Sequence, residues 1–154
     1  MKAIRITEHG SADVLKVHDI NIPQCPKDRV LVHMKACSIN HLDIWVRNGL
    51  PGIPVKLPLI LGSDGSGKIL ECGSSIENFK VNDDVVIQPG TFDSLSTKEN
   101  YSPDYGILGE TSDGVQAEYV ILKEHNIYKK ADHLTYEEAA SMQLVFMTAY
   151  QMIV

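Results

Sequence analysis

The chain has 154 residues, with 44% hydrophobic and 22% charged residues, which are ordinary values for a globular protein with one domain-sized core. The formal net charge of −6 and the absence of a long uninterrupted apolar run argue against nucleic-acid and membrane partners, because phosphate binding needs a basic patch. The three cysteines form no Cys-x-x-Cys pair, which is typical of a protein in a reducing cytoplasm.

The first part of the chain predicts short strands separated by turns. Residues 1–6 and 30–39 alternate apolar and polar side chains, as half-buried strands do. A turn at 82–84 precedes a further apolar strand, and a turn at 113–114 precedes an alternating strand at 115–121. This pattern favours a barrel or a sandwich over a doubly wound sheet.

A glycine-rich segment at 62–68 matches G-x-x-x-x-G-K. A phosphate-binding loop would continue with Ser or Thr and then a helix, but Ile69 follows here and the pattern continues as a strand. The dinucleotide pattern fails as well, because Leu70 stands where its third glycine would be. We therefore interpret 62–67 as a turn-rich hinge that brings two strands close together.

The segment Asn40–Trp45 opens a short predicted helix. Asn40 is suited to the N-cap position, and Asp43 three residues later favours the helix N-terminus electrostatically. One interpretation is a capped helical turn and nothing more. The other is functional, because an amide, the His41 imidazole and a carboxylate converge where polar ligands bind.

Cys37, His41 and Asp64 are a candidate metal-ligand set. A strand-to-helix boundary falls between Cys37 and His41, so their spacing does not ensure a shared face. A lone buried cysteine and a surface histidine account for the same residues, and this interpretation is favoured.

The C-terminal part returns to helix. Residues 135–138 form a predicted capping box, and the apolar residues after them are interrupted by Gln143, Thr148 and Gln151, as in a core helix. No later residues of this chain are available to cover that helix. We therefore expect a missing domain or a partner to cover residues 135–154.

Taken in order, four segments resemble those of medium-chain alcohol dehydrogenases and quinone oxidoreductases. They are residues 32–43, 61–67, 114–120 and 135–150. The resemblance implies a mainly β fold with short helices. It places a GroES-like β-barrel, the substrate and catalytic domain, at 1–125, and at 126–154 the connecting helices to a Rossmann dinucleotide-binding domain that this chain does not contain.

Four departures from the family pattern concern zinc. The positions of the zinc ligands in zinc-dependent members are Asn40, Ser63 and Asp64 here, and the lobe at 91–102, which carries four cysteines in many relatives, contains none. Asparagine and serine do not hold zinc in such sites. The chain thus resembles the zinc-free quinone oxidoreductase branch, and we expect no metal site.

The resemblance implies an NADP- or NAD-dependent oxidoreductase that transfers hydride to a carbonyl, enone or quinone substrate. It assigns catalytic positions to Asn40, Asp43, Ser63 and Asp64, and cofactor-binding positions to Asn40, His41 and Thr148. Asn40 would lie beside the nicotinamide and the substrate carbonyl, and Thr148 would touch the nicotinamide ring.

We expect the chain alone to be inactive, because the dinucleotide fingerprint of the family lies downstream of residue 154. An exposed helix face or sheet edge would favour a homo-oligomer. Two alternatives stay open: a non-catalytic GroES-like protein-interaction module, and a zinc-dependent alcohol dehydrogenase with unusual ligands.

Overall fold

The computed structural model describes residues 1–92 and 102–154. Its strands are β1 (Lys2–Ile6), β2 (Lys16–Asp19), β3 (Arg29–Cys37), β4 (Leu59–Ile60), β5 (Gly65–Cys72), β6 (Asp84–Ile87), β7 (Gly90–Thr91), β8 (Gly106–Ile107), β9 (Tyr119–Lys123) and β10 (Ile127–Lys129). Its helices are α1 (His41–Asn48), α2 (Tyr136–Ala139) and α3 (Gln143–Ile153), with short 3₁₀ turns η1 (Ala12–Val14) and η3 (Glu124–Asn126).

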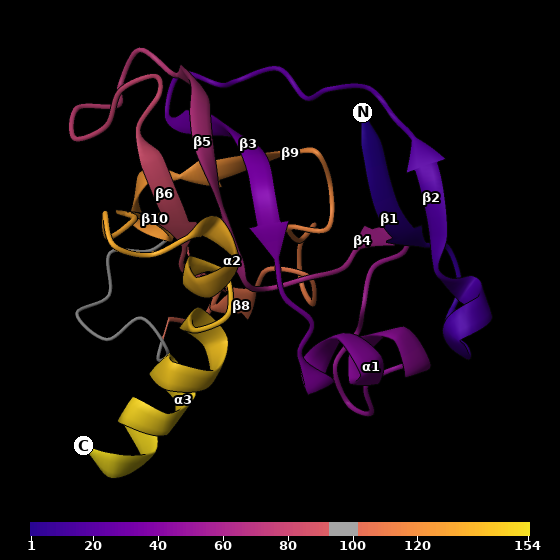
Figure 1. The fold of residues 1–154 in the computed structure, drawn as a ribbon. Coiled ribbons are helices and arrows are strands. Elements are labelled where there is room, and N and C mark those ends of the chain that lie inside the picture. The colour runs from indigo at the N-terminus through magenta and orange to yellow at the C-terminus, as the bar shows by residue number, and fades with distance from the viewer. Residues whose placement is uncertain (93–101) are drawn as a thin grey trace.

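The strands form a curled, mostly antiparallel β structure, which confirms the mainly β prediction (Figure 1). The larger sheet has the order β10-β6-β5-β3-β9, and a smaller sheet has the order β2-β1-β4. The strands predicted at 1–6 and 30–39 are confirmed as β1 and β3, and the turn before β6 is confirmed by the positive φ of 75° at Asn82.

Two groups of buried side chains form the core. The larger group lies against the five-stranded sheet and includes Val32, Ile69, Ile87 and Leu122. The smaller group joins β1 to α1 and β4 through residues such as Ile6 and Val46. Helix α1 is therefore held by its apolar side against the smaller sheet, and its N-terminus meets the loop that leads into β5.

The prediction of a turn-rich hinge at 62–67 is wrong in its second half, because β5 already begins at Gly65. A Cβ atom at Gly67 would lie 2.4 Å from the carbonyl oxygen of His33, so only glycine allows this approach of β5 to β3. A close contact between two strands was expected, but Gly67 makes it as a residue of β5 and not as part of a turn.

The strand predicted at 115–121 begins later, since β9 starts at Tyr119. The preceding residues pair irregularly with β1 instead: Gln116 accepts a backbone hydrogen bond from Ile4 N, and Glu118 donates one to Lys2 O. This segment therefore connects the two sheets rather than extending one of them.

Helix α2 lies on the larger sheet and carries the chain toward α3. The Ser66 hydroxyl donates to the carbonyl of Tyr136 at 2.6 Å, and the Tyr136 hydroxyl donates to the carboxylate of Asp84 at 2.5 Å. Burial and this hydrogen bond raise the pKa of Tyr136 to about 12. The position of α2 is therefore tied to β5 and β6.

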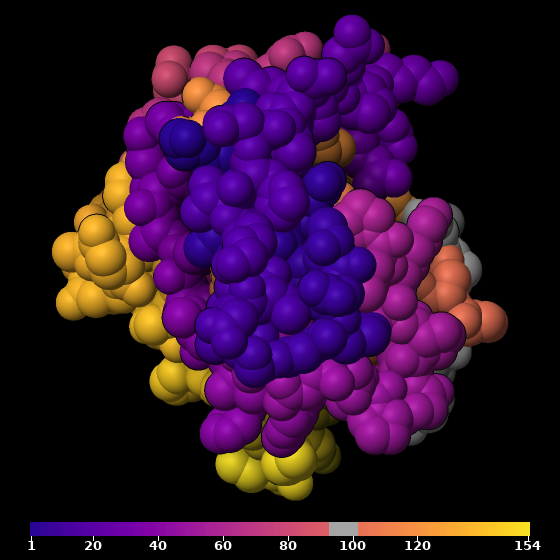
Figure 2. Space-filling view, turned by 90° about the vertical axis from the view of Figure 1, so that its right-hand side faces the viewer, coloured from indigo at the N-terminus to yellow at the C-terminus, as the bar shows by residue number. Residues whose placement is uncertain are grey.

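Helix α3 was predicted as a core helix, yet none of its residues is buried among the described residues. Phe146 is 65% exposed and Tyr150 is 68% exposed. Figure 2 shows the C-terminal residues projecting below the face formed by the N-terminal strands. The apolar composition is thus not matched by burial within the described part of this chain.

No helix among residues 1–92 and 102–154 is long and apolar enough to cross a membrane. The predicted cysteine-free lobe at 91–102 lies mostly outside the described residues.

Candidate functional site

The N-terminus of α1 is organised by the buried carboxylate of Asp43. One carboxylate oxygen accepts the backbone N–H of Asn40 at 2.7 Å, which confirms Asn40 as the N-cap and Asp43 as its N3 partner. The other oxygen accepts the N–H of Gly62 at 2.9 Å. Asp43 therefore caps its own helix and also ties it to the loop before β5.

Asp64 lies at the centre of the site and is fully buried. One carboxylate oxygen accepts from the side-chain amide of Asn40 at 3.1 Å and from the Ser38 hydroxyl at 3.5 Å. The other accepts the backbone N–H of Leu144, in the first turn of α3, at 2.8 Å. One side chain thus connects three segments that are far apart in the sequence.

Burial dominates the electrostatics of both carboxyls. Desolvation raises the pKa of Asp43 and that of Asp64, and the hydrogen bonds that each accepts oppose this rise. The charge of Asp64 raises the pKa of Asp43 further. Each carboxylate is therefore costly to ionise, and the hydrogen bonds that it accepts compensate for part of that cost.

Thr148 is connected to this network through α3. Its hydroxyl donates to the carbonyl oxygen of Leu144 at 2.7 Å, one turn earlier in the helix. We call the sequence of hydrogen bonds from Asn40 through Asp64 and Leu144 to Thr148 the Asn40–Thr148 chain. Its two ends are the residues that the family resemblance assigned to the nicotinamide.

Two residues predicted for the site lie outside this network. The Ser63 hydroxyl is buried and donates to the carbonyl of Leu108 at 2.8 Å. His41 is exposed, with its ring 5.6 Å from that of Trp45. His41 is accessible to a ligand, whereas Ser63 is held within the fold, and their predicted roles stay predictions.

Sequence reasoning missed three participants: Ser38, the Gly62 N–H and the Leu144 N–H. Ser38 lies two residues before Asn40 and carries a hydroxyl, so its proximity was a usable signal. The other two donate through the backbone, and a glycine or leucine in the sequence gives no sign of that.

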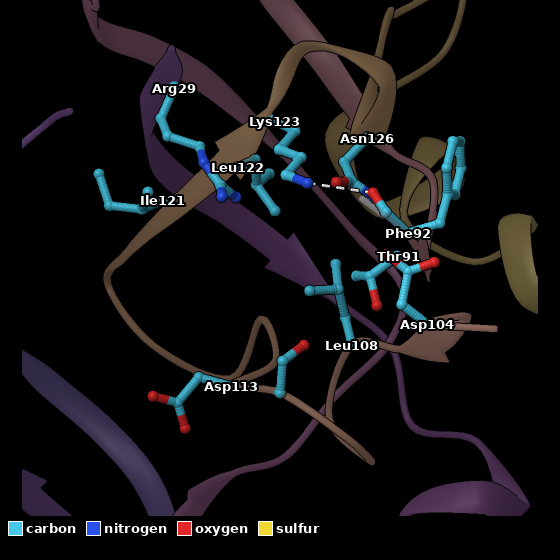
Figure 3. Close-up of a pocket in the computed structure, with 11 residues that line it drawn as sticks. Arg29, Thr91, Phe92, Asp104, Leu108, Asp113, Ile121, Leu122, Lys123 and Asn126 are labelled. Carbon is cyan, nitrogen blue, oxygen red and sulfur yellow. Dashed lines mark hydrogen bonds between the residues drawn. The ribbon is translucent and has the colours of Figure 1, made fainter. Parts of the chain in front are cut away.

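A separate pocket of about 300 Å³ lies between β9 and the segment after β7 (Figure 3). Arg29 and Lys123 line it together with Asp104 and Asp113, and the Lys123 ammonium donates to the carbonyl of Phe92 at 3.1 Å. None of the residues predicted for the site lines this pocket. Asn40 is half-buried and Thr148 is exposed, and both lie on other elements than those that line this pocket.

Comparison with known proteins settles the family. The model of the alcohol dehydrogenase GroES-like domain matches residues 26–132. This chain belongs to the medium-chain dehydrogenase/reductase family. The resemblance read from the sequence is thereby confirmed, and so is the GroES-like fold of the chain.

Individual members of the family cover the whole chain. Crotonyl-CoA carboxylase/reductase of Cereibacter sphaeroides is 35% identical over 98% of this chain and 38% of its own length. Human quinone oxidoreductase is 30% identical over 100% of this chain and 41% of its own length. The crystal structure of an NAD-dependent alcohol dehydrogenase is 41% identical, with a TM-score of 0.94, over 100% of this chain and 46% of that one.

The chain thus spans less than half the length of these medium-chain dehydrogenase/reductase relatives. The names of the relatives include both alcohol dehydrogenases and quinone oxidoreductases.

Proposed function

We propose that this chain is the catalytic-domain portion of a zinc-independent oxidoreductase that uses NADP or NAD to transfer hydride to a carbonyl, enone or quinone. The observation that supports this most is the Asn40–Thr148 chain, in which a buried carboxylate fixes the amide of Asn40. Family membership supports the oxidoreductase class, and the choice of substrate class rests on the site.

The chemistry expected of Asn40 follows from its hydrogen bonds. An ionised carboxylate only accepts, so the NH₂ end of the Asn40 amide faces Asp64. An amide nitrogen carries two hydrogens, and the second is left to donate to a substrate oxygen. When an enone or quinone accepts hydride, its negative charge delocalises, so that oriented hydrogen-bond donors can stabilise it without a Lewis acid.

The cofactor supplies the hydride when bound, and the protein supplies orientation. His41, the first residue of α1, and Thr148, in the middle of α3, are both exposed, so a dinucleotide could reach them. In this proposal Thr148 orients the nicotinamide and His41 approaches the pyrophosphate. The remaining contacts would come from a cofactor domain.

Zinc independence is supported by the residues at the three positions that correspond to zinc ligands in zinc-dependent members of the family. The hydrogen bonds of Asn40, Ser63 and Asp64 go to protein groups. Among the described residues, no group of three or more His, Cys, Asp or Glu side chains could hold a metal ion.

The decisive experiment supplies the part of a relative that this chain does not match. Residues 1–154 would replace the matching segment of human quinone oxidoreductase, to which they align end to end. We expect the purified chimera to oxidise NADPH with 1,4-benzoquinone and to contain less than stoichiometric zinc by mass spectrometry. Asn40→Ala should lower kcat about tenfold or more, which corresponds to one lost hydrogen bond in the transition state.

The matched control is Asn48→Ala, at the far end of the same helix, which should leave kcat unchanged. A folded chimera that binds NADPH but reduces neither quinones nor enones would overturn the proposal. Activity that disappears with a chelator and returns with zinc would refute zinc independence. The isolated 154-residue chain should show no turnover.

One observation favours a second candidate function. The apolar residues of α3 are exposed, including Phe146, Tyr150 and Ile153. A large exposed apolar face is typical of a protein-interaction surface. A non-catalytic module would use this face for a partner or for a homo-oligomer. It would also leave the chimera inactive, so the same assay separates the two functions.

A further inference from the structure

Helix α3 begins without a cap of its own. The residue at its N-cap position is Met142, whose side chain makes no capping hydrogen bond. The first N–H groups of a helix need acceptors from outside the helix, and a thioether is a poor one. Asp64, 80 residues earlier in the chain, accepts the N–H of Leu144 instead.

The same carboxylate holds the Asn40 amide with its other oxygen. We infer that Asp64 is a positioning residue, which fixes the Asn40 amide and the N-terminus of α3 relative to each other. The two ends of the Asn40–Thr148 chain then face the cofactor together. Asp64 does not touch the reacting atoms in this scheme. The catalytic part of the inference rests on the proposed function, but the structural coupling does not.

The geometry supports this role over simple packing. A negative charge at a helix N-terminus is favoured by the helix dipole, and α3 has no acidic residue in its own first turn. Asp64 is fully buried, so water does not readily replace it as the acceptor. Removing its charge therefore affects both partners at once.

Nuclear magnetic resonance on the 154-residue chain tests the coupling directly. The side-chain NH₂ signals of Asn40 and the backbone amide of Leu144 should shift with pH when Asp64 titrates. The neighbouring titratable groups are the Asp43 carboxyl in α1 and the Cys37 thiol at the end of β3. The Gly62 amide, which donates to Asp43, provides an internal control.

Asp64→Asn separates the two carboxyls. We expect the Leu144 shift to disappear in this variant and the Gly62 shift to remain. Persistence of the Leu144 shift, or an Asn40 side chain that does not follow Leu144 in the unaltered chain, would overturn the inference. The titration of the unaltered chain needs no variant, so the test survives a variant that fails to fold.

The catalytic consequence is measured in the chimera. Asp64→Asn should lower kcat about tenfold with little change in the KM for quinone, and Asp64→Glu, which keeps the carboxylate, should restore part of kcat. Equal loss in both variants would indicate a packing role and contradict positioning. A chimera without any activity, combined with the shared titration, would refute the proposed function while supporting the coupling.

Discussion

Helices α2 and α3 are neighbours in the sequence but begin in opposite ways. In α2 the Thr135 hydroxyl accepts the N–H of Glu138, and the Glu138 carboxylate accepts the N–H of Thr135, so the start is satisfied within four residues. In α3 the acceptor is Asp64, which lies 80 residues earlier in the sequence. A local cap can form whenever its own segment is helical, whereas a remote cap forms only when the rest of the fold brings the two segments together.

The largest effect is expected where the remote cap is removed. Asp64→Ala leaves the Leu144 N–H and the Asn40 amide without their acceptor, and should lower the free energy of unfolding by about 2–3 kcal/mol. Urea denaturation measures this. Ser63→Ala, next to it and equally buried, loses one neutral hydrogen bond and should cost about 1 kcal/mol. Equal losses of unfolding free energy in the two variants would show that the Asp64 cap contributes no more to stability than an ordinary buried hydrogen bond.

Removing the local cap should matter less. Thr135→Ala deletes one side of the capping box at an exposed position and should cost about 1 kcal/mol. Its effect should be confined to α2, so hydrogen exchange should rise at Glu138 and not at Leu144. Faster exchange at Leu144 in this variant would mean that α2 and α3 fray together, and that the two caps are not independent.

A pH effect sharpens the comparison further, because only the remote cap is a buried carboxyl. Burial raises the folded-state pKa of Asp64, so between the ordinary carboxyl pKa and that raised value the folded state binds more protons than the unfolded state. This contribution to stability is fully present below the ordinary pKa and is lost as pH rises through the raised one.

Unfolding free energies of the unaltered chain and of Asp64→Asn should therefore diverge over that pH window, with the unaltered chain gaining relative stability as pH falls. Asp43 is present in both proteins, so the rise of its pKa that burial causes cancels in the difference, whereas the part that the charge of Asp64 causes does not. A difference between the two proteins that does not change with pH would contradict the assignment.

The smallest effect is expected at the solvent end of the Asn40–Thr148 chain. Thr148→Val keeps the shape of the side chain and removes an exposed hydrogen bond within α3, so the free energy of unfolding should change by less than about 0.5 kcal/mol. In the chimera the same substitution should raise the KM for NADPH. A large loss of stability would show that Thr148 has a structural role instead.

Much of this site could be predicted from spacing. Asn40 and Asp43 are three residues apart, and so are Thr135 and Glu138, and both pairs behave as their spacing predicts. The prediction of a hinge at 62–67 failed in its second half, because a glycine is compatible with either a turn or a close contact between strands. Gly67 proved to be a strand residue because β3 approaches it too closely for any side chain.

The sequence by itself determined the family, the mainly β fold and the local starts of α1 and α2, because each of these depends on residues close together in the chain. Only the tertiary structure decided that Asp64 joins Asn40 to α3. The physical reason is that one partner is a backbone N–H, which every residue except proline carries. Which backbone N–H bonds to Asp64 depends on its position in the fold, and no residue type in the sequence indicates it.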